Sequence, residues 1–296
     1  MNARTFLAAS ALPSREARLV LAVICSSTTR RRARQARAAP YLRTRGRLAG
    51  RFERALRRVL DFAKHETLRK LHRYAFTHRP LRAQEEQPTH PDAGRLSFNA
   101  DELRQDLIRM LQMEVPGVVG ASAAATLAGV GYRDPWRLPA QETLDLIAQR
   151  MNLISGLPEE LFADVQRELS GGLNAGESIA QLSARIDRIF SPERAALIAE
   201  TETSAAYGFA SQAASLAAGV RFKQWIHSGL PKEPREDHLD IDGLIVPIDD
   251  FYPVGDPPLM YPHDPDGSAE DVINCGCISI PATEEEYLAQ QGEEAA

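Results

Sequence analysis

The sequence predicts a mainly α-helical protein that ends in a small α+β domain, in which a long helix packs on a short β-sheet. Before Gly219, apolar residues recur every three or four positions over long stretches, which is the period of an amphipathic helix. After Gly219, short alternating runs are separated by Pro and Gly, as in strands joined by turns. The 296 residues, 44% of them hydrophobic and 25% charged, exclude collagen, a coiled-coil fibre and a wholly disordered chain.

Charge is distributed very unevenly along the chain. Residues 1–82 contain 21 of the 35 Lys and Arg but only 4 of the 40 Asp and Glu, a balance of +17, so the remainder carries −22. Such asymmetry predicts a basic segment that binds nucleic acid or an acidic partner, attached to an acidic body. An arginine-rich genome would explain the choice of Arg over Lys, but not its confinement to one end.

We expect residues 1–83 to form a basic arm followed by an amphipathic helix. The Arg-rich run 30–47 has no acidic residue, and Pro40 and Gly46 should interrupt any helix there, so we predict a solvated arm. Over residues 51–74, apolar residues repeat at helical spacing while arginines collect on another face. Three interpretations of the arginine face are open: it is solvated, it contacts phosphates, or it lies on a membrane surface. The lack of Trp and of a large apolar face weakens the membrane interpretation.

The middle of the chain is predicted to be a linker, residues 84–96, followed by a helical region, residues 97–172. The linker contains two Pro among polar neighbours. Asn99 has the features of an N-cap, because an acidic residue follows three positions later and a periodic apolar run comes next. A second amphipathic segment is predicted at 142–154, whereas the small residues of 118–132 fit either a helix or a turn.

Residues 176–283 are predicted to form the C-terminal α+β domain. Its residues 191–193 supply an N-cap serine, a first-turn proline and an acid near the positive end of the helix dipole. A long helix should therefore run from residue 192 to about 218 and stop at Gly219. Its apolar stripe includes Glu202, a carboxylate that has to be paired if it is buried.

Three strands and a tail are expected after this helix. Residues 220–227, 244–248 and 273–280 alternate in the manner of strands, with Pro-rich loops between them. No Lys or Arg occurs from Phe251 onward. Residues 284–296 form an acidic tail that we expect to be mobile.

Two cysteines near the end of the chain raise the question of a metal. Cys275 and Cys277 point to the same side of a strand, and His238 and His263 could complete four zinc ligands. Against this, side chains two residues apart in an unbent strand are separated by about 6.6 Å, whereas two thiolates on one zinc approach within roughly 4 Å. Either His238, Cys275 and Cys277 hold a structural zinc ion, or the thiols pack without metal as small hydrophobic groups and there is no cofactor. With Cys25 as the third cysteine, a reducing compartment is the simpler interpretation.

The same residues permit a cysteine nucleophile with a histidine base, but no nucleophile elbow, oxyanion loop or helix N-terminus in the sequence supports one. A calcium loop starting at Asp240 fails because its twelfth position is Phe251 where a bidentate Glu is required. Neither a GxxxxGKS/T nor a GxGxxG phosphate-binding motif occurs. The alternative function is therefore a zinc- or thiol-dependent hydrolase of the toxin or nuclease type that uses His238, Cys275 and Cys277.

Three runs follow one another in the C-terminal domain: IAETETSAAYGFASQAASLAAGVRFKQWIHSG, then PREDHLDIDGLIVPIDDFY, then INCGC. Within them the informative positions are Thr201, Glu202, Trp225, Arg235, His238, Asp242, Gly243, Asn274, Cys275 and Cys277. This combination resembles the C-terminal domain of phage Mu protein F-like minor head proteins, the phage head morphogenesis family. The sequence departs from the family pattern at two places. Gly276 lies between the two cysteines where the family often has Arg, and residues 272–273 replace the His-Pro that the family commonly has just before Asn-Cys.

The resemblance implies a structural component of the virion rather than an enzyme. It implies a place inside the head or at the portal vertex, a stay in the host cytoplasm during assembly, and the portal protein and other capsid components as partners. As a hypothesis, Glu202 pairs with Arg235 or His238 and locks the turn 235–243 onto the long helix. Neither a signal peptide nor a membrane anchor is expected, because the apolar run 19–25 is far shorter than the ~20 residues of a spanning helix.

The basic segment acquires a role from the same resemblance. DNA packed in a head is a dense polyanion, and arginines that neutralise phosphates gain from counterion release without reading sequence. We therefore expect sequence-independent contact with double-stranded DNA, with an acidic portal surface as the competing partner. The residues expected to make this contact are Arg30, Arg31, Arg32, Arg34, Arg37, Arg43, Arg45, Arg47, Arg51, Arg54 and Arg58.

Overall fold

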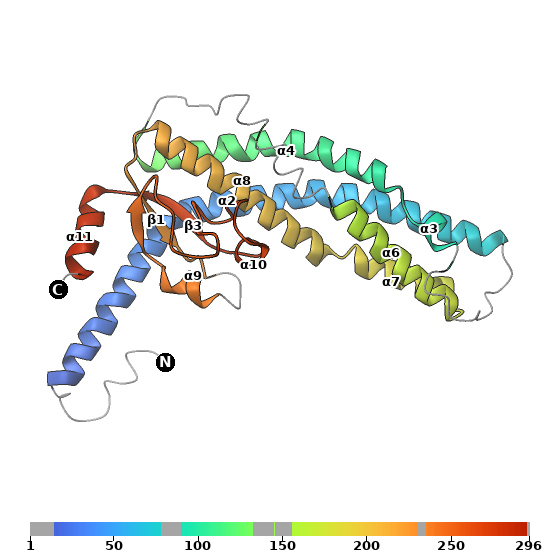
Figure 1. Ribbon diagram of the computed structural model, residues 1–296, viewed down its shortest axis with the longest axis horizontal. Helices are drawn as coiled ribbons and strands as arrows, with labels where there is room; N and C mark the ends of the chain where they lie inside the picture. Colours follow the sequence, from blue (N-terminus) through green and yellow to red (C-terminus); the bar gives the residue numbers. More distant parts are fainter. Residues whose placement is uncertain are drawn as a thin grey trace. The chain divides into compact units, whose positions relative to one another are not determined.

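The structure is a computed structural model that describes residues 15–77, 90, 92–132, 145, 156–229 and 235–294, without side chains for residues 15–28 and 77. The chain divides into two compact units, Met1–Ala39 and Pro40–Ala296. The predicted fold class is confirmed: the described part is mainly helical, with a small three-stranded sheet near its C-terminal end (Figure 1).

The helices before the sheet are α2 (Arg15–Thr77), α3 (Ala93–Leu96), α4 (Ala100–Gly129), α6 (Leu157–Asn174), α7 (Ile179–Ile189) and α8 (Pro192–Ala217). The strands are β1 (Phe222–Ile226), β2 (Ile245–Pro247) and β3 (Ile278–Ala282), and the short helices α9 (Glu236–Asp240) and α10 (Ala269–Val272) lie between them in sequence. Helix α11 (Glu284–Glu294) ends the described chain. None of the described helices is long and apolar enough to cross a membrane.

Helix α2 corrects the prediction of a solvated arm at residues 30–47. The helix contains Pro40 and continues through Gly46, where an added Cβ would meet nothing within 4 Å. Proline removes one helical hydrogen bond and crowds the preceding turn, which is a local cost. Tyr41 and Arg45, on the following turns, are 7% and 3% exposed. Burial of this face, which the Arg-rich composition hides, therefore keeps the segment helical and packed.

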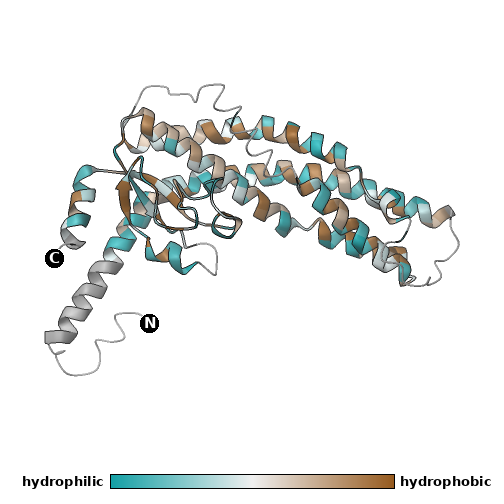
Figure 2. Cartoon of the chain, in the orientation of Figure 1, coloured by the Kyte–Doolittle hydropathy of each residue, from teal (hydrophilic) through white to brown (hydrophobic). Residues whose placement is uncertain are grey.

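Further along, α2 confirms the predicted amphipathic pattern. Phe52, Leu56, Leu60 and Leu71 are each at most 4% exposed and share one apolar core with residues of α4, α6, α7 and α8. Hydrophilic and hydrophobic residues alternate around these helices in Figure 2. The core therefore needs no disulfide or metal in this part of the fold.

The predicted linker at 84–96 is wrong at its end. Its residues 84–89 and 91 lie outside the described residues, but α3 is helical and buries Ala93 and Leu96. The N-cap prediction is confirmed, because the Asn99 side chain accepts hydrogen bonds from the next two backbone N–H groups of α4. Helix α4 then runs through most of the undecided segment 118–132. The segment predicted at 142–154 lies outside the described residues except for residue 145.

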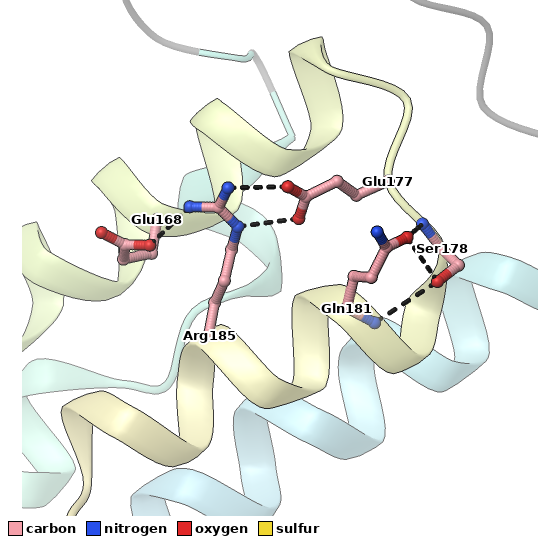
Figure 3. A network of polar contacts seen from close by, with 5 residues as sticks. All are labelled: Glu168, Glu177, Ser178, Gln181 and Arg185. Atoms are coloured by element: carbon pink, nitrogen blue, oxygen red, sulfur yellow. Dashed lines mark hydrogen bonds and ion pairs between the residues drawn. The ribbon is translucent and has the colours of Figure 1, made fainter.

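Helices α6 and α7 form a hairpin closed by polar contacts (Figure 3). The guanidinium of Arg185 binds Glu177 through two hydrogen bonds of 2.7 Å and Glu168 through a third of 2.7 Å. Ser178 and Gln181 form a reciprocal capping box at the start of α7. These contacts fix the entry of α7, and so the start of the segment that leads into α8.

Helix α8 begins and ends as predicted. The Ser191 side chain caps its first turn by accepting a hydrogen bond from the backbone N–H of Arg194, and Gly219 follows its end with φ +71°, a left-handed conformation that favours glycine. The helix packs along α4, where the hydroxyls of Thr126 and Ser211 lie 2.9 Å apart in a buried contact. Helix α8 thus connects the helical core to the sheet.

The sheet has the order β2-β1-β3 with both pairs antiparallel, and every residue of the central strand β1 is buried. The strand predicted at 273–280 begins only at residue 278. The prediction of a mobile tail at 284–296 is wrong over the described part, because α11 packs beside the sheet. Its Tyr287 ring stacks on Phe222 at 4.4 Å, and the Gln290 side chain accepts a hydrogen bond from the backbone N–H of Ile245.

Candidate functional site

The candidate site is built on β1 and the turn that follows it. Trp225 is fully buried, and its ring stands edge-on to the His238 ring with centroids 5.3 Å apart. The backbone N–H of Gly243 donates to the Trp225 carbonyl at 2.9 Å, and Gly243 has φ +99°, which glycine adopts without strain. The Asp242 carboxylate accepts a hydrogen bond from the backbone N–H of His227. These predicted motif residues therefore fix the turn.

His238, on the short helix α9, faces both thiols. Its Nδ1 lies 3.4 Å from Sγ of Cys275 and 3.7 Å from Sγ of Cys277, and the three side chains are at most 2% exposed. The two cysteines precede β3 instead of lying within it, and Asn274 has φ +57°. The chain is therefore bent at this point, which brings the ligand atoms of the histidine and both cysteines within 4.8 Å of one another.

His263 joins this cluster from a different loop. It is 1% exposed and has φ +64°, and neither of its ring nitrogens has a partner in hydrogen-bonding geometry. It nevertheless faces the Cys275 thiol closely enough to lower its pKa. The loop approaches α8 at Gly208, where an added Cβ would lie 2.8 Å from the Pro262 carbonyl oxygen and 2.8 Å from the Tyr261 ring. Glycine at this position lets the histidine loop come close.

The residues around His263 are held by buried polar contacts. The Asp264 carboxylate accepts hydrogen bonds from the backbone N–H groups of Met260 and Asp266 at 2.8 and 3.1 Å. The ammonium of Lys223, on β1, donates to the Met260 carbonyl at 2.7 Å. Burial lowers the pKa of Lys223 to about 8, although three nearby carboxylates oppose the shift. The histidine loop is thus tied to the central strand.

The two thiols have very different affinities for a proton. The hydrogen bond from Cys277 lowers the pKa of Cys275 well below its usual value, helped by the charge of His263 and a hydrogen bond with His238, while burial opposes it. The same hydrogen bond and burial raise the pKa of Cys277. The backbone N–H of Cys277 also donates to the Cys275 sulfur at 3.4 Å.

A buried cation ties the cysteine segment to the helices, and it is Arg45 of α2. Its Nη1 donates to the backbone carbonyls of Gly276 and Cys277 at 3.2 and 3.0 Å. Its Nη2 lies 3.1 Å from Oε1 of Glu200 on α8, and the arginine side chain is 4% exposed. The residue predicted to contact DNA therefore serves the fold, because its charge is buried between α8 and the loop.

The hypothesis that Glu202 pairs with Arg235 or His238 stays a prediction. Arg235 donates to the Ile273 carbonyl at 2.8 Å, and His238 directs Nδ1 to the thiols. Glu202 is buried in α8, with 9% exposed. An ion pair joins Arg45 to Glu200 of α8, which is two residues from Glu202 and therefore on a different face of the helix from the stripe that the sequence pattern singled out.

A second contact and a cavity lie on the same side. The Thr201 hydroxyl accepts a long hydrogen bond of 3.4 Å from the backbone N–H of Asn274. Next to it is a cavity of about 370 Å³. It is lined by Leu42, Arg45, Gly46, Glu200, Ser228, Asn274, Cys275 and Gly276.

The remaining arginines predicted to contact DNA fall into two groups. In the first unit, Arg30, Arg31 and Arg32 are exposed, while Arg34 and Arg37 are half-buried. In the second unit, five exposed arginines follow one another along α2 at steps of four, four, three and four residues, which places them on one helix face. We call them the arginine stripe: Arg43, Arg47, Arg51, Arg54 and Arg58. Arg51 also pairs with Glu114 at 2.7 Å.

Comparison with known proteins finds a family model that matches the part of the chain containing the cysteine cluster. Residues 163–280 match the family model described as Phage Mu protein F like protein. This part of the chain is similar to that family. The matched span, here called the Mu F-like region, begins within α6, includes α8 and the thiols, and ends within β3.

A curated relative gives no further function. The chain is 25% identical over 207 residues, 67% of each protein, to an uncharacterized protein YqbB of Bacillus subtilis (strain 168). No solved structure matches the chain. The resemblance stated from the sequence is therefore confirmed for the Mu F-like region, whereas partners and chemistry have to be argued from the structure.

Sequence reasoning named His263 only as a possible zinc ligand and missed the role of Arg45. His263 lies on the loop that approaches α8 at Gly208, and it faces the Cys275 thiol. Arg45 was hidden among exposed arginines of the same helix. Its one distinguishing signal is the spacing of four residues from Tyr41 and Ala49, which are also buried.

Proposed function

We propose that this chain is a phage or prophage-derived minor head protein that acts during head assembly or genome delivery, inside the head or at the portal vertex. The observation that carries the proposal is the match of residues 163–280 to the Mu F-like family. Within the region Asp242 and Arg235 bind backbone groups, and Arg45 of α2 binds two backbone carbonyls of its cysteine segment. This is the pattern of a structural module rather than a reaction centre.

The arginine stripe supports a contact with DNA. Its residues extend over about 22 Å of helix, at 1.5 Å per residue. They lie on the exposed face, opposite the apolar residues that pack in the core. A row of arginines on a rigid helix neutralises successive phosphates of a duplex and releases counterions, without reading the bases. We therefore propose that packaged DNA is the partner of this face.

The test is a salt titration of the full chain on duplexes of two unrelated sequences. In one variant Arg43, Arg47, Arg54 and Arg58 are changed to Gln. In a matched control, four exposed arginines elsewhere, Arg109, Arg167, Arg188 and Arg221, are changed to Gln. Each lost phosphate contact should reduce the slope of log Kobs against log salt by about 0.9, hence by roughly 3.6 for the stripe variant.

Both duplexes should give the same affinity, and the control should keep most of the wild-type slope. Equal losses in the two variants would show a general charge effect and no interface on α2. Weak binding of DNA by the wild type, together with stripe-dependent binding of the portal protein, would assign the stripe to an acidic portal surface instead.

The hydrolase alternative is less consistent with the burial of its residues. His238, Cys275 and Cys277 are each at most 2% exposed. Cys275 borders the cavity of about 370 Å³, but both cysteines pack with Trp225 and Tyr252 in one apolar cluster. A thiol nucleophile is normally in a partly exposed setting. We therefore propose a structural role for the cluster.

A further inference from the structure

The cluster of His238, His263, Cys275 and Cys277 has the composition of a metal centre, and this question is independent of whether the chain binds DNA. Buried polar atoms are nearly always hydrogen-bonded, and each exception needs an explanation. Here three buried imidazole nitrogens, Nε2 of His238 and both nitrogens of His263, have no hydrogen-bond partner. Two histidines of this kind beside two thiols are costly unless something binds them.

The ligand atoms of His238, Cys275 and Cys277 lie within 4.8 Å of one another and fit a tetrahedral ion, whereas His263 does not lie within that distance of all three. With metal–nitrogen and metal–sulfur bonds of about 2.05 and 2.3 Å, tetrahedral geometry separates a nitrogen and a sulfur ligand by about 3.6 Å. The observed separations of His238 Nδ1 from Cys275 and Cys277 Sγ are 3.4 and 3.7 Å. The separation of about 6.6 Å expected for an unbent strand, which argued against zinc, is removed by the bend at Asn274.

We propose that His238, Cys275 and Cys277 form a structural Zn²⁺ site in the Mu F-like region, and that His263 closes on the ion as its fourth ligand. On binding, the two thiols release two protons and become thiolates, and the two imidazoles bind as neutral ligands. The charges of Zn²⁺ and the two thiolates cancel. A neutral centre suits its surroundings, because the cysteines pack in an apolar cluster with Trp225.

The donor set selects the metal. Thiolate and imidazole ligands suit Zn²⁺, whereas Mg²⁺ and Ca²⁺ require oxygen ligands. The carboxylates of Asp237 and Asp271 also lie within 4.8 Å of a ring nitrogen of His238. Both are already engaged, since Asp237 accepts from a backbone N–H and Asp271 from the Ser268 hydroxyl. Acids beside a metal-bound histidine commonly orient it, so these two are assigned a supporting role.

The four ligands come from three separate segments: α9, the loop before α10 and the segment before β3. An ion shared by them would fix the two loops that the sheet alone does not order. With four protein ligands, no position remains for a substrate, which distinguishes a structural site from a catalytic one.

The experiment measures zinc in the full chain, purified under reducing conditions and analysed by elemental mass spectrometry without DNA. Wild type should contain one zinc per chain, and Cys275→Ser, Cys277→Ser and His263→Gln should lose it. Two matched controls, Cys25→Ser and the exposed His65→Gln, should keep it. Zinc content that is zero in the wild type after reconstitution, or unchanged in all ligand variants, would overturn the proposal.

A measurement on the wild type alone covers the case in which the variants fail to fold. Replacement of zinc by Co²⁺ should give the intense visible bands of a tetrahedral ion and a sulfur-to-cobalt charge-transfer band. A chelator should lower the thermal midpoint, and Zn²⁺ but not Mg²⁺ should restore it. An octahedral cobalt spectrum, or a midpoint insensitive to the chelator, would contradict the proposal. Hydrolysis of DNA or an ester by the zinc-loaded chain, abolished in Cys275→Ser, would contradict a closed site.

Discussion

Replacing Arg45 tests whether α2 is part of the Mu F-like fold or only a basic arm. Arg45→Ala removes two charged hydrogen bonds to the carbonyls of Gly276 and Cys277, at 3.2 and 3.0 Å. Hydrogen bonds to charged groups contribute about 1.5–3 kcal/mol each, and breaking a buried pair from one side costs about 3–5 kcal/mol. The ion pair with Glu200 adds less, because that side chain is 35% exposed. We expect a loss of about 3–5 kcal/mol.

The loss is measured by urea unfolding of the full chain, followed by circular dichroism and tryptophan fluorescence. In a thermal scan it should lower the midpoint by about 10 °C, given roughly 2–4 °C per kcal/mol at this size. Arg43→Ala, on the exposed face of the same helix, is the control and should change stability by less than about 0.5 kcal/mol. Glu200→Gln should cost about 1 kcal/mol or less. If Arg45→Ala and Arg43→Ala have the same stability, the buried contact is refuted.

Three further changes probe other parts of the account. Gly208→Ala should destabilise the chain by about 1–3 kcal/mol, because the new methyl would lie 2.8 Å from the Pro262 carbonyl oxygen. Its control, Gly120→Ala, has open space around the new methyl and should stabilise the chain by about 0.5–1 kcal/mol. Thermal scans of both variants measure the two changes. Burial lowers the pKa of Lys223 to about 8, so between pH 8 and about 10.4 the unfolded chain binds one more proton than the folded chain. The free energy of unfolding should therefore rise with pH over this range, by at most about 3 kcal/mol. Urea titrations across the range should show the rise in the wild type and not in Lys223→Met. Arg185→Lys should lose the paired hydrogen bonds of the α6–α7 hairpin and about 1 kcal/mol of stability by urea unfolding, and a wild-type midpoint would refute their contribution.

Capping residues and local residue patterns predicted the ends of α8 and the positions of two strands. Ser191 and Gly219 carry the capping chemistry of α8, and the helix begins and ends between them. The sequence pattern placed β1 and β2 within two residues of their observed bounds. The motif residues from the resemblance, such as Asn274 and Trp225, also lie at the cluster.

The missed features depend on contacts between distant segments. Pro40 and the Arg-rich composition around it indicated a solvated arm, but burial of Arg45 against carbonyls more than 200 residues away decides the conformation. The charge of residues 284–294 indicated a tail, yet Tyr287 stacks on the sheet. His263 enters the cluster only through the fit of its loop against α8. A sequence pattern records local preference and cannot contain such pairings.

The central claim, that the chain is a minor head protein, is tested most directly by its presence in particles. Particles would be induced from the strain that carries the gene, purified by density centrifugation, and analysed by quantitative mass spectrometry. The account predicts that the chain is present in DNA-filled heads at far fewer copies than the major capsid subunit. Its absence from filled and empty heads, with the chain recovered only among free proteins, would contradict the account.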